Sequence, residues 1–128
     1  MSDKFTVEII SPIKSIIKSD TSEVVIPSYE GEMGILKNHI PIITFLRPGV
    51  IKIINEIERN YFVEDGTVEF IDDNLLILTS TAKDVNNFDK TEIDGIISEA
   101  EKKIGNSETS DKEKYLLSYK ISTLKNLN

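Results

Sequence analysis

The chain of 128 residues is long enough for one sizeable hydrophobic core with a small appendage, and too short for more than two domains. Its net charge of -7 argues against nucleic acid and anionic lipid as direct ligands, because phosphate groups bind clustered lysine and arginine. The absence of cysteine excludes disulfides and thiolate metal sites. Since no apolar run approaches the ~20 residues that span a bilayer, we expect no direct membrane insertion. Residues 1–5 lack the pattern of a signal peptide, which predicts a cytosolic setting.

Short β-strands are predicted for the first part of the chain. Apolar and polar residues alternate over residues 5–9, a second strand runs from Ile13 toward Asp20, and a third covers residues 22–26. Pro27 has no amide hydrogen for a sheet ladder, so we expect the third strand to end there.

Residues 29–34 read Tyr-Glu-Gly-Glu-Met-Gly, and glycines three apart favour a tight loop with two carboxylates at its tip. Glu30 and Glu32 could be read as an acid–base pair, but a flexible loop lacks the dry, rigid setting that such catalysis needs. A solvated turn or a contact surface is the better interpretation.

Two further strands are predicted at residues 34–36 and 40–45, with turns at residues 37–39 and 47–49. The sole histidine, His39, lies in the first of these turns. A catalytic or metal-binding role would need a second histidine or a cysteine, and the chain has neither. We therefore favour a structural or interface role for His39.

The middle of the chain continues the β pattern. Residues 50–57 alternate in part, residues 58–60 form a turn, and residues 61–64 pair with the preceding strand. Asp65-Gly66 is a strong two-residue hairpin signal, which predicts that residues 61–64 also pair with residues 68–71.

Residues 72–74 make the next turn, and residues 75–81 form a last strand whose run of Leu and Ile predicts burial on both faces. Calcium binding by Asp65, Asp72 and Asp73 is an alternative, but their spacing fits no EF-hand and turn chemistry explains them. Short strands at this regular spacing indicate an all-β sandwich or barrel.

The pattern changes to helix after a linker at residues 83–88. Asp89 with Glu92, or Thr91 with Asp94, offers an N-cap. An apolar stripe at helical spacing follows, consisting of Ile93, Ile96, Ile97, Ala100 and Ile104.

Gly105-Asn106 predicts the end of this helix, and Ser110 with Glu113 is a capping box that opens a second helix with a Leu117, Ile121 and Leu124 stripe. Helices this short are insecure alone, so we expect them to close on one another. The predicted fold class is α+β: an N-terminal flattened all-β sandwich or barrel followed by a C-terminal antiparallel two-helix hairpin. We place the β-sandwich domain at residues 1–84 and the linker and helical hairpin at residues 85–128.

The central segment carries a family resemblance. It resembles the signature of the epsilon subunit of bacterial F-type ATP synthase, the counterpart of the mitochondrial delta subunit. That signature runs as a proline, E-G-x-x-G-I-L, N-H-x-P and L-x-P-G-V-I. The matching residues are Pro27, Glu30, Gly31, Gly34, Ile35, Leu36, Asn38, His39, Pro41, Leu46, Pro48, Gly49, Val50 and Ile51.

The resemblance implies a non-catalytic rotor subunit of the central stalk, without cofactor or metal, that couples the gamma subunit to the c-ring in proton-driven ATP synthesis. It implies a peripheral place on the cytoplasmic face of the bacterial inner membrane. The implied gamma-subunit contacts are Ser11, His39, Ile43, Thr44 and Val50. The implied c-ring contacts are Glu30, Gly31 and Glu32.

Some members of this family bind ATP on the hairpin through an I/L-D-x-x-R-A motif. Here Ile93 and Asp94 match, but Ile97 stands where the motif has arginine and Ser98 where it has alanine. Because the main attraction for a polyanion is lost, we predict weak or absent ATP binding.

Family members also inhibit ATP hydrolysis when the second helix meets an acidic segment of the beta subunit in the catalytic head. The lysines from Thr109 onward outnumber Asp111 and Glu113, which favours such a contact, although a solvated helix face is the plain alternative. The lysines concerned are Lys112, Lys114, Lys120 and Lys125. A free-standing β-sandwich that binds another protein or a small ligand is the alternative function, and an enzyme is a distant third.

Overall fold

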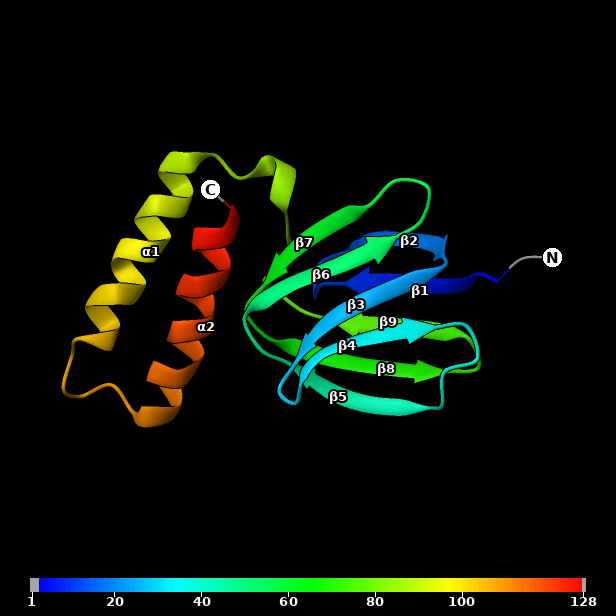
Figure 1. Cartoon of the computed structure of the whole chain (residues 1–128), viewed down its shortest axis with the longest axis horizontal. Coiled ribbons are helices and arrows are strands. Elements are labelled where there is room, and N and C mark those ends of the chain that lie inside the picture. Colours follow the sequence, from blue (N-terminus) through cyan, green and yellow to red (C-terminus); the bar gives the residue numbers. More distant parts are fainter. Residues whose placement is uncertain (1–2, 128) are drawn as a thin grey trace.

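The computed structural model describes residues 3–127, which form a β-sandwich with two helices packed at one end (Figure 1). The predicted fold class is confirmed. The strands are β1 (Phe5–Ile10), β2 (Ser15–Thr21), β3 (Glu23–Ser28), β4 (Gly31–Leu36), β5 (Ile42–Leu46), β6 (Gly49–Ile54), β7 (Arg59–Val63), β8 (Gly66–Ile71), β9 (Asn74–Leu78) and β10 (Lys83–Asp84). A 3₁₀ turn (Val85–Asn87) follows, so the predicted linker carries structure of its own, and α1 (Lys90–Ile104) and α2 (Asp111–Leu127) complete the fold.

Hydrogen bonding joins the strands in the order β10-β7-β6-β3-β5-β8-β9-β1-β2, with β4 on the other side of β3. Strands β3 and β5 meet at a single register pair, Ser28 with Leu46, and there the sheet folds over into a second layer. One layer is therefore β10-β7-β6-β3-β4 and the other is β5-β8-β9-β1-β2. The β1–β9 ladder is parallel, and the remaining ladders among the described strands are antiparallel.

The main core lies between the two layers, because each strand turns alternate side chains inward. Phe5 and Phe70 meet edge to face in this core, with ring centroids 5.5 Å apart. The other large side chains that are fully buried there include Ile9, Ile26, Ile35, Leu46, Ile51, Leu75 and Ile77.

The predicted hairpin at Asp65-Gly66 is wrong. Strand β7 pairs with β6 and β10 in one layer, whereas β8 pairs with β5 and β9 in the other. The dipeptide instead forms the corner between the layers: Gly66 has φ +149°, and the Thr79 hydroxyl donates to the Asp65 carbonyl at 2.7 Å. Turn residues set the local backbone, but they do not choose the strand that lies alongside.

The predicted end of the third strand at Pro27 is also wrong. Strand β3 continues to Ser28, with Pro27 opposite Glu32, and the Pro27 carbonyl accepts the Arg47 amide at 2.9 Å. The missing proline amide therefore interrupts the ladder at one point without ending the strand. The turn is limited to residues 29 and 30, and Gly31, with φ +119°, already begins β4.

Two predictions after residue 55 need smaller corrections. The turn after β6 falls at residues 55–58, before the predicted residues 58–60, because β7 already begins at Arg59. Burial of the last strand on both faces is wrong: Leu75 and Ile77 are buried, but Leu78 is 45% exposed. The β10-β7-β6-β3-β4 layer covers the inner side of the layer that contains β9. Among the described residues, no other element covers its outer side.

The helical region agrees with its local signals. Asp89 caps α1 by accepting the Glu92 amide at 2.8 Å, and the Ser110 hydroxyl accepts the Glu113 amide at 3.1 Å at the start of α2. The helices run antiparallel, and α2 lies between α1 and the strands (Figure 1). Their apolar stripes form a second cluster with Phe62 of β7, and its buried helical members are Ile93, Ile97 and Leu124.

Candidate interaction surfaces

One face of the sandwich exposes large apolar side chains. The register places Phe45 opposite Thr67, Thr67 opposite Leu78, and Leu78 beside Ile10, so these residues form a row across β5, β8, β9 and β1. Ile43 lies two residues from Phe45 on the same side of β5. We call Ile10, Ile43, Phe45 and Leu78 the outer apolar face.

The exposure of this face is high for aliphatic and aromatic side chains. Ile43 is 75% exposed, Phe45 56% and Leu78 45%. An open groove of about 660 Å³ runs along one end of the face, lined by Ile10, Pro12, Tyr29, Phe45 and Leu78 among others. A contiguous apolar surface of this kind is typical of a protein–protein contact.

The five predicted gamma-subunit contacts do not form one surface. Ser11 lines the groove and Ile43 belongs to the outer apolar face. Thr44 is 8% exposed, because β5 alternates and turns this residue toward the core. The His39 ring lies edge-on to Phe70 with centroids 5.9 Å apart, and Val50 lies in the other layer under α2.

Phe45 and Leu78 are the surface residues that the sequence interpretation missed. Alternation along residues 42–46 puts Thr44 and Phe45 on opposite sides of the strand, but it does not say which of the two faces the core. Leu78 carried no signal of its orientation either, because a run of leucine and isoleucine does not say which face a neighbouring layer covers.

The predicted carboxylate tip is an ordered turn. The Ser28 hydroxyl donates to the Gly31 carbonyl at 2.6 Å and accepts the Glu30 amide at 3.3 Å. Glu30 and Glu32 are both exposed, so neither lies in the enclosed setting that acid–base catalysis uses. Glu32 also lines a cavity of about 390 Å³ between the strands and α2.

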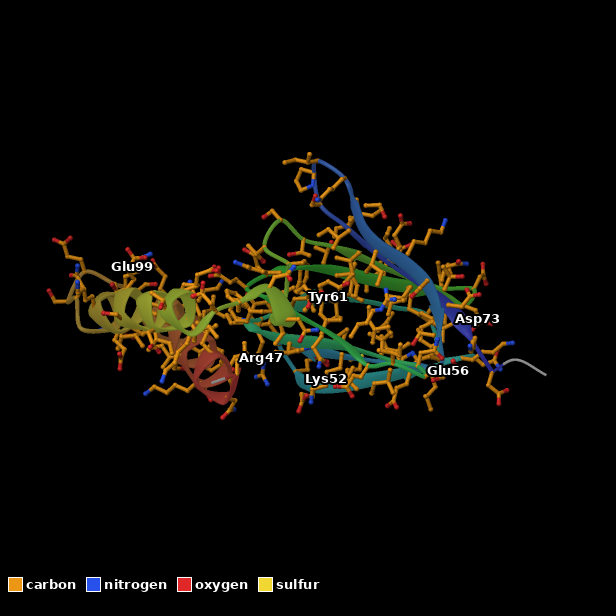
Figure 2. The ribbon with its side chains drawn as sticks, turned by 90° about the horizontal axis from the view of Figure 1, so that it is seen from above. Arg47, Lys52, Glu56, Tyr61, Asp73 and Glu99 are labelled. Atoms are coloured by element: carbon orange, nitrogen blue, oxygen red, sulfur yellow. The ribbon has the colours of Figure 1, made fainter. Side chains whose placement is uncertain are left out.

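Three polar contacts join the hairpin and its linker to the strands. The Arg47 guanidinium lies 3.9 Å from the ring centroid of Tyr119 on α2 (Figure 2 shows Arg47 beside the helices). The hydrogen bond from Tyr115 lowers the pKa of the Tyr119 hydroxyl, and the charge of Arg47 acts in the same direction. Lys120 pairs with Glu64 at 2.7 Å.

The third contact joins β10 to α1: Lys83 pairs with Glu92, and its ammonium lies 4.5 Å from the Phe88 ring centroid. Of the other three lysines predicted to meet the catalytic head, Lys112 and Lys125 are exposed and Lys114 is half-buried.

The residues that match the ATP motif are separated by the packing of α1. Ile93 is 4% exposed and Ile97 is 8% exposed, and both belong to the hairpin cluster, whereas Asp94 and Ser98 face outward. The position at which the motif carries arginine is thus filled by a core side chain. Weak or absent ATP binding stays a prediction.

The aspartates considered for calcium belong to turns. Asp72 and Asp73 have φ of +49° and +58°, and the Asp73 carboxylate accepts the Asn38 amide at 2.7 Å, which ties the β8–β9 turn to the β4–β5 turn. Among residues 3–127, no three His, Asp or Glu side chains gather as a metal site. In the same part of the chain, neither helix has the length and hydropathy of a membrane span.

Comparison with known proteins gives one family throughout. The model of the ATP synthase delta/epsilon chain β-sandwich domain matches residues 4–85. An ATP synthase epsilon chain of Pelagibacter ubique is 50% identical over 130 residues, covering 100% of both chains. One of Parvibaculum lavamentivorans is 32% identical, covering 99% of this chain and 97% of that relative.

Solved structures share the fold. A chain in the cryo-EM structure of Euglena gracilis mitochondrial ATP synthase (OSCP/F1/c-ring) superposes with a TM-score of 0.78 at 19% identity, covering 99% of this chain and 81% of that one. A chain in the central stalk/c-ring structure of Tetrahymena thermophila mitochondrial ATP synthase has a TM-score of 0.61 at 18% identity, covering 95% and 92%. The sequence matches extend over the sandwich and, in the first two relatives, over the hairpin as well. The chain therefore belongs to the ATP synthase delta/epsilon family.

Proposed function

We propose that the chain is a non-catalytic central-stalk subunit of a proton-translocating F-type ATP synthase, and that it couples the gamma subunit to the c-ring. The observation that carries this proposal is the match at 50% identity to an ATP synthase epsilon chain over the full length of both proteins. The two structural relatives come from mitochondrial ATP synthase assemblies, one of F1 with the c-ring and one of the central stalk with the c-ring. The mechanism is mechanical: rotation driven by proton flow passes as torque through this subunit.

Contact with the gamma subunit is proposed for the outer apolar face together with Ser11. Burying Ile43, Phe45 and Leu78 against a partner removes apolar area from water at about 25 cal/mol per Å². Thr44 and His39 would support this face from behind and from the adjoining turn. Val50 would meet a partner only from the side on which α2 lies.

Contact with the c-ring is proposed for Glu30, Gly31 and Glu32. The exposed carboxylates and the turn held by Ser28 suit polar loops of a neighbouring protein. Reversing both charges with Glu30→Lys and Glu32→Lys is expected to weaken retention of the c-ring in purified complexes. The same reversal at exposed Glu56 and Glu58 is the control, and equal retention in the two variants would contradict this contact.

Contact with the beta subunit of the catalytic head, and inhibition of ATP hydrolysis through it, are proposed for the lysines of α2. Replacing Lys112, Lys114 and Lys125 by glutamine should raise the ATPase activity of the assembled enzyme, because it removes attraction for an acidic segment. Unchanged activity would argue against an inhibitory contact. We also propose that residues 1–84 and 85–128 act as separate units, and that the complex presents them on the cytoplasmic face of the bacterial inner membrane.

Affinity purification of the full chain at native expression levels tests the assignment. We expect the large ATPase subunits, the gamma subunit and the c-ring to co-purify with it. A monodisperse monomer without these partners would instead favour a free-standing β-sandwich that binds another protein.

A further inference from the structure

The hairpin is attached to the sandwich by a narrow apolar contact. In the hairpin cluster, Phe62 of β7 is the buried residue that comes from a strand, and its ring packs edge to face with Phe88 of the linker at 5.7 Å. On α2 only Leu124 is buried, within the described residues. Val85, Ile121 and Leu127 pack against this cluster but stay partly exposed, so the polar contacts add to an incompletely buried attachment.

Glu64 and Lys120 form the polar contact that is best placed to control attachment. The Lys120 ammonium lies 2.7 Å from the Glu64 carboxylate, and the Lys120 and Glu64 side chains are 18% and 39% exposed. Glu64 directly follows β7, and its amide donates to the Thr81 hydroxyl at 3.0 Å, so its backbone is fixed on the sandwich. Because this pair is partly removed from water, salt screens it less than it screens an exposed pair.

Lys120 differs in this respect from the other lysines of α2. Lys112 and Lys125 are exposed and Lys114 is half-buried, and among the residues that the structure describes none of these three takes part in an ion pair. Lys120 is thus the lysine whose charge is already neutralised by a carboxylate of the sandwich.

We infer that Glu64 is an intramolecular competitor for Lys120. In the attached hairpin Glu64 holds the ammonium, and a carboxylate of another subunit can pair with Lys120 only after the hairpin has left Glu64. The same lysine therefore stabilises the attached hairpin and, once released, the contact with an acidic partner. This inference rests on the proposed contact between α2 and the catalytic head.

Amide hydrogen exchange of the isolated full chain tests the first part of the inference, that the Glu64–Lys120 pair holds the hairpin on the sandwich. A detached short hairpin is marginal in water, so exchange of residues 119–124 reports detachment even when detachment is rare. We expect Glu64→Gln and Lys120→Gln each to raise this exchange about threefold to fivefold. The double variant should give the same increase as either single variant, because both remove one interaction.

A matched control and a salt series complete this test. Glu58→Gln removes the same charge at an exposed position in the β6–β7 turn and should leave the exchange unchanged. High salt should raise the exchange of the wild-type chain more than that of the double variant. If the fold-increases of the two single variants multiply in the double variant, or if neither single variant raises exchange, the Glu64–Lys120 pair does not hold the hairpin on the sandwich.

ATP hydrolysis by the assembled enzyme tests the second part, that Lys120 released from Glu64 pairs with a carboxylate of another subunit. Glu64→Gln leaves Lys120 available for a partner and is expected to lower hydrolysis at least about twofold, whereas Lys120→Gln removes the shared cation and should raise it. Both variants weaken the attachment of the hairpin, so a purely structural role predicts shifts of hydrolysis in one direction. Shifts in the same direction overturn the competition. If neither variant nor the Lys112, Lys114 and Lys125 replacements change hydrolysis, it is the proposed contact with the catalytic head that fails.

Discussion

Gly66 is the residue that allows the tight backbone corner between the two layers of the sandwich. A Cβ at this position would lie 2.6 Å from the Leu78 carbonyl oxygen and 3.0 Å from Thr79 Cβ, and φ is +149°. Only glycine meets both conditions without strain. The corner between β7 and β8 therefore depends on this residue, although the sequence indicated a hairpin.

Replacing Gly66 by alanine is expected to lower the free energy of unfolding by about 2 kcal/mol or more, because the backbone strain and the close contact act together. Urea unfolding followed by circular dichroism measures this change. Gly34→Ala is the control, since its Cβ would approach only the flexible Glu23 side chain at 3.3 Å. Equal losses in the two variants would show that the corner is not strained.

Tyr61 is a buried titratable residue of β7 (Figure 2). Burial raises the pKa of its hydroxyl, and the negative charge of Asp84 on β10 raises it further. The unfolded chain therefore loses this proton at lower pH than the folded chain. The contribution of Tyr61 to stability is complete below about pH 10 and is lost as the pH rises from there through the folded pKa.

Tyr61→Phe is consequently expected to flatten the decline in unfolding free energy above about pH 10. Urea unfolding of both chains over this range gives the two slopes, and Tyr29→Phe, at a side chain 42% exposed, is the control. Parallel curves for the wild-type chain and Tyr61→Phe would contradict the burial argument.

At the scale of the element, α1 combines a good N-cap with a weak interior. Asp89 satisfies the first turn, but Gly95 lies in the middle of the helix, where it is exposed and where an added Cβ would meet no heavy atom within 4 Å. Glycine at such a position costs about 1 kcal/mol relative to alanine. The hairpin is thus less stable than it would be with alanine at position 95.

Gly95→Ala should raise the free energy of unfolding of the hairpin by about 1 kcal/mol, because it removes backbone entropy without a new contact. Thermal unfolding followed by helical circular dichroism measures it. Ser98→Gly, one turn further on the exposed side, should act in the opposite direction. A loss of stability in Gly95→Ala would contradict an open site.

The elements also show which parts of the fold the sequence could predict. Helix starts, helix ends and apolar stripes depend on residues within about one turn of each other, and Asp89, Ser110 and Gly105 lie where those signals indicated. Strand pairing depends on residues far apart in the chain. Local patterns therefore could predict neither the corner between the layers at Gly66 nor the parallel β1–β9 ladder.

At the scale of the whole molecule, the sandwich presents the outer apolar face and the carboxylate turn, and the helices cover a different part of it. Turn chemistry predicted Glu30 and Glu32 at the tip of a loop, whereas Ser11 and Ile43 were expected as partner contacts only from the family resemblance. The sequence could not separate Thr44 from Phe45, because that assignment requires knowing which side of β5 faces the second layer.

The central claim is that the outer apolar face joins this subunit to its rotor partner. Ile43→Glu combined with Phe45→Glu tests it, and Ile57→Glu combined with Leu36→Glu is the control, because these side chains have similar exposures of 73% and 56% at other positions. Circular dichroism checks that both variants fold. The measurement is ATP-driven proton pumping by membrane vesicles that carry each assembled complex. We predict a loss of about tenfold or more for the outer-face variant and little change for the control. Equal pumping by the two variants would contradict the claim.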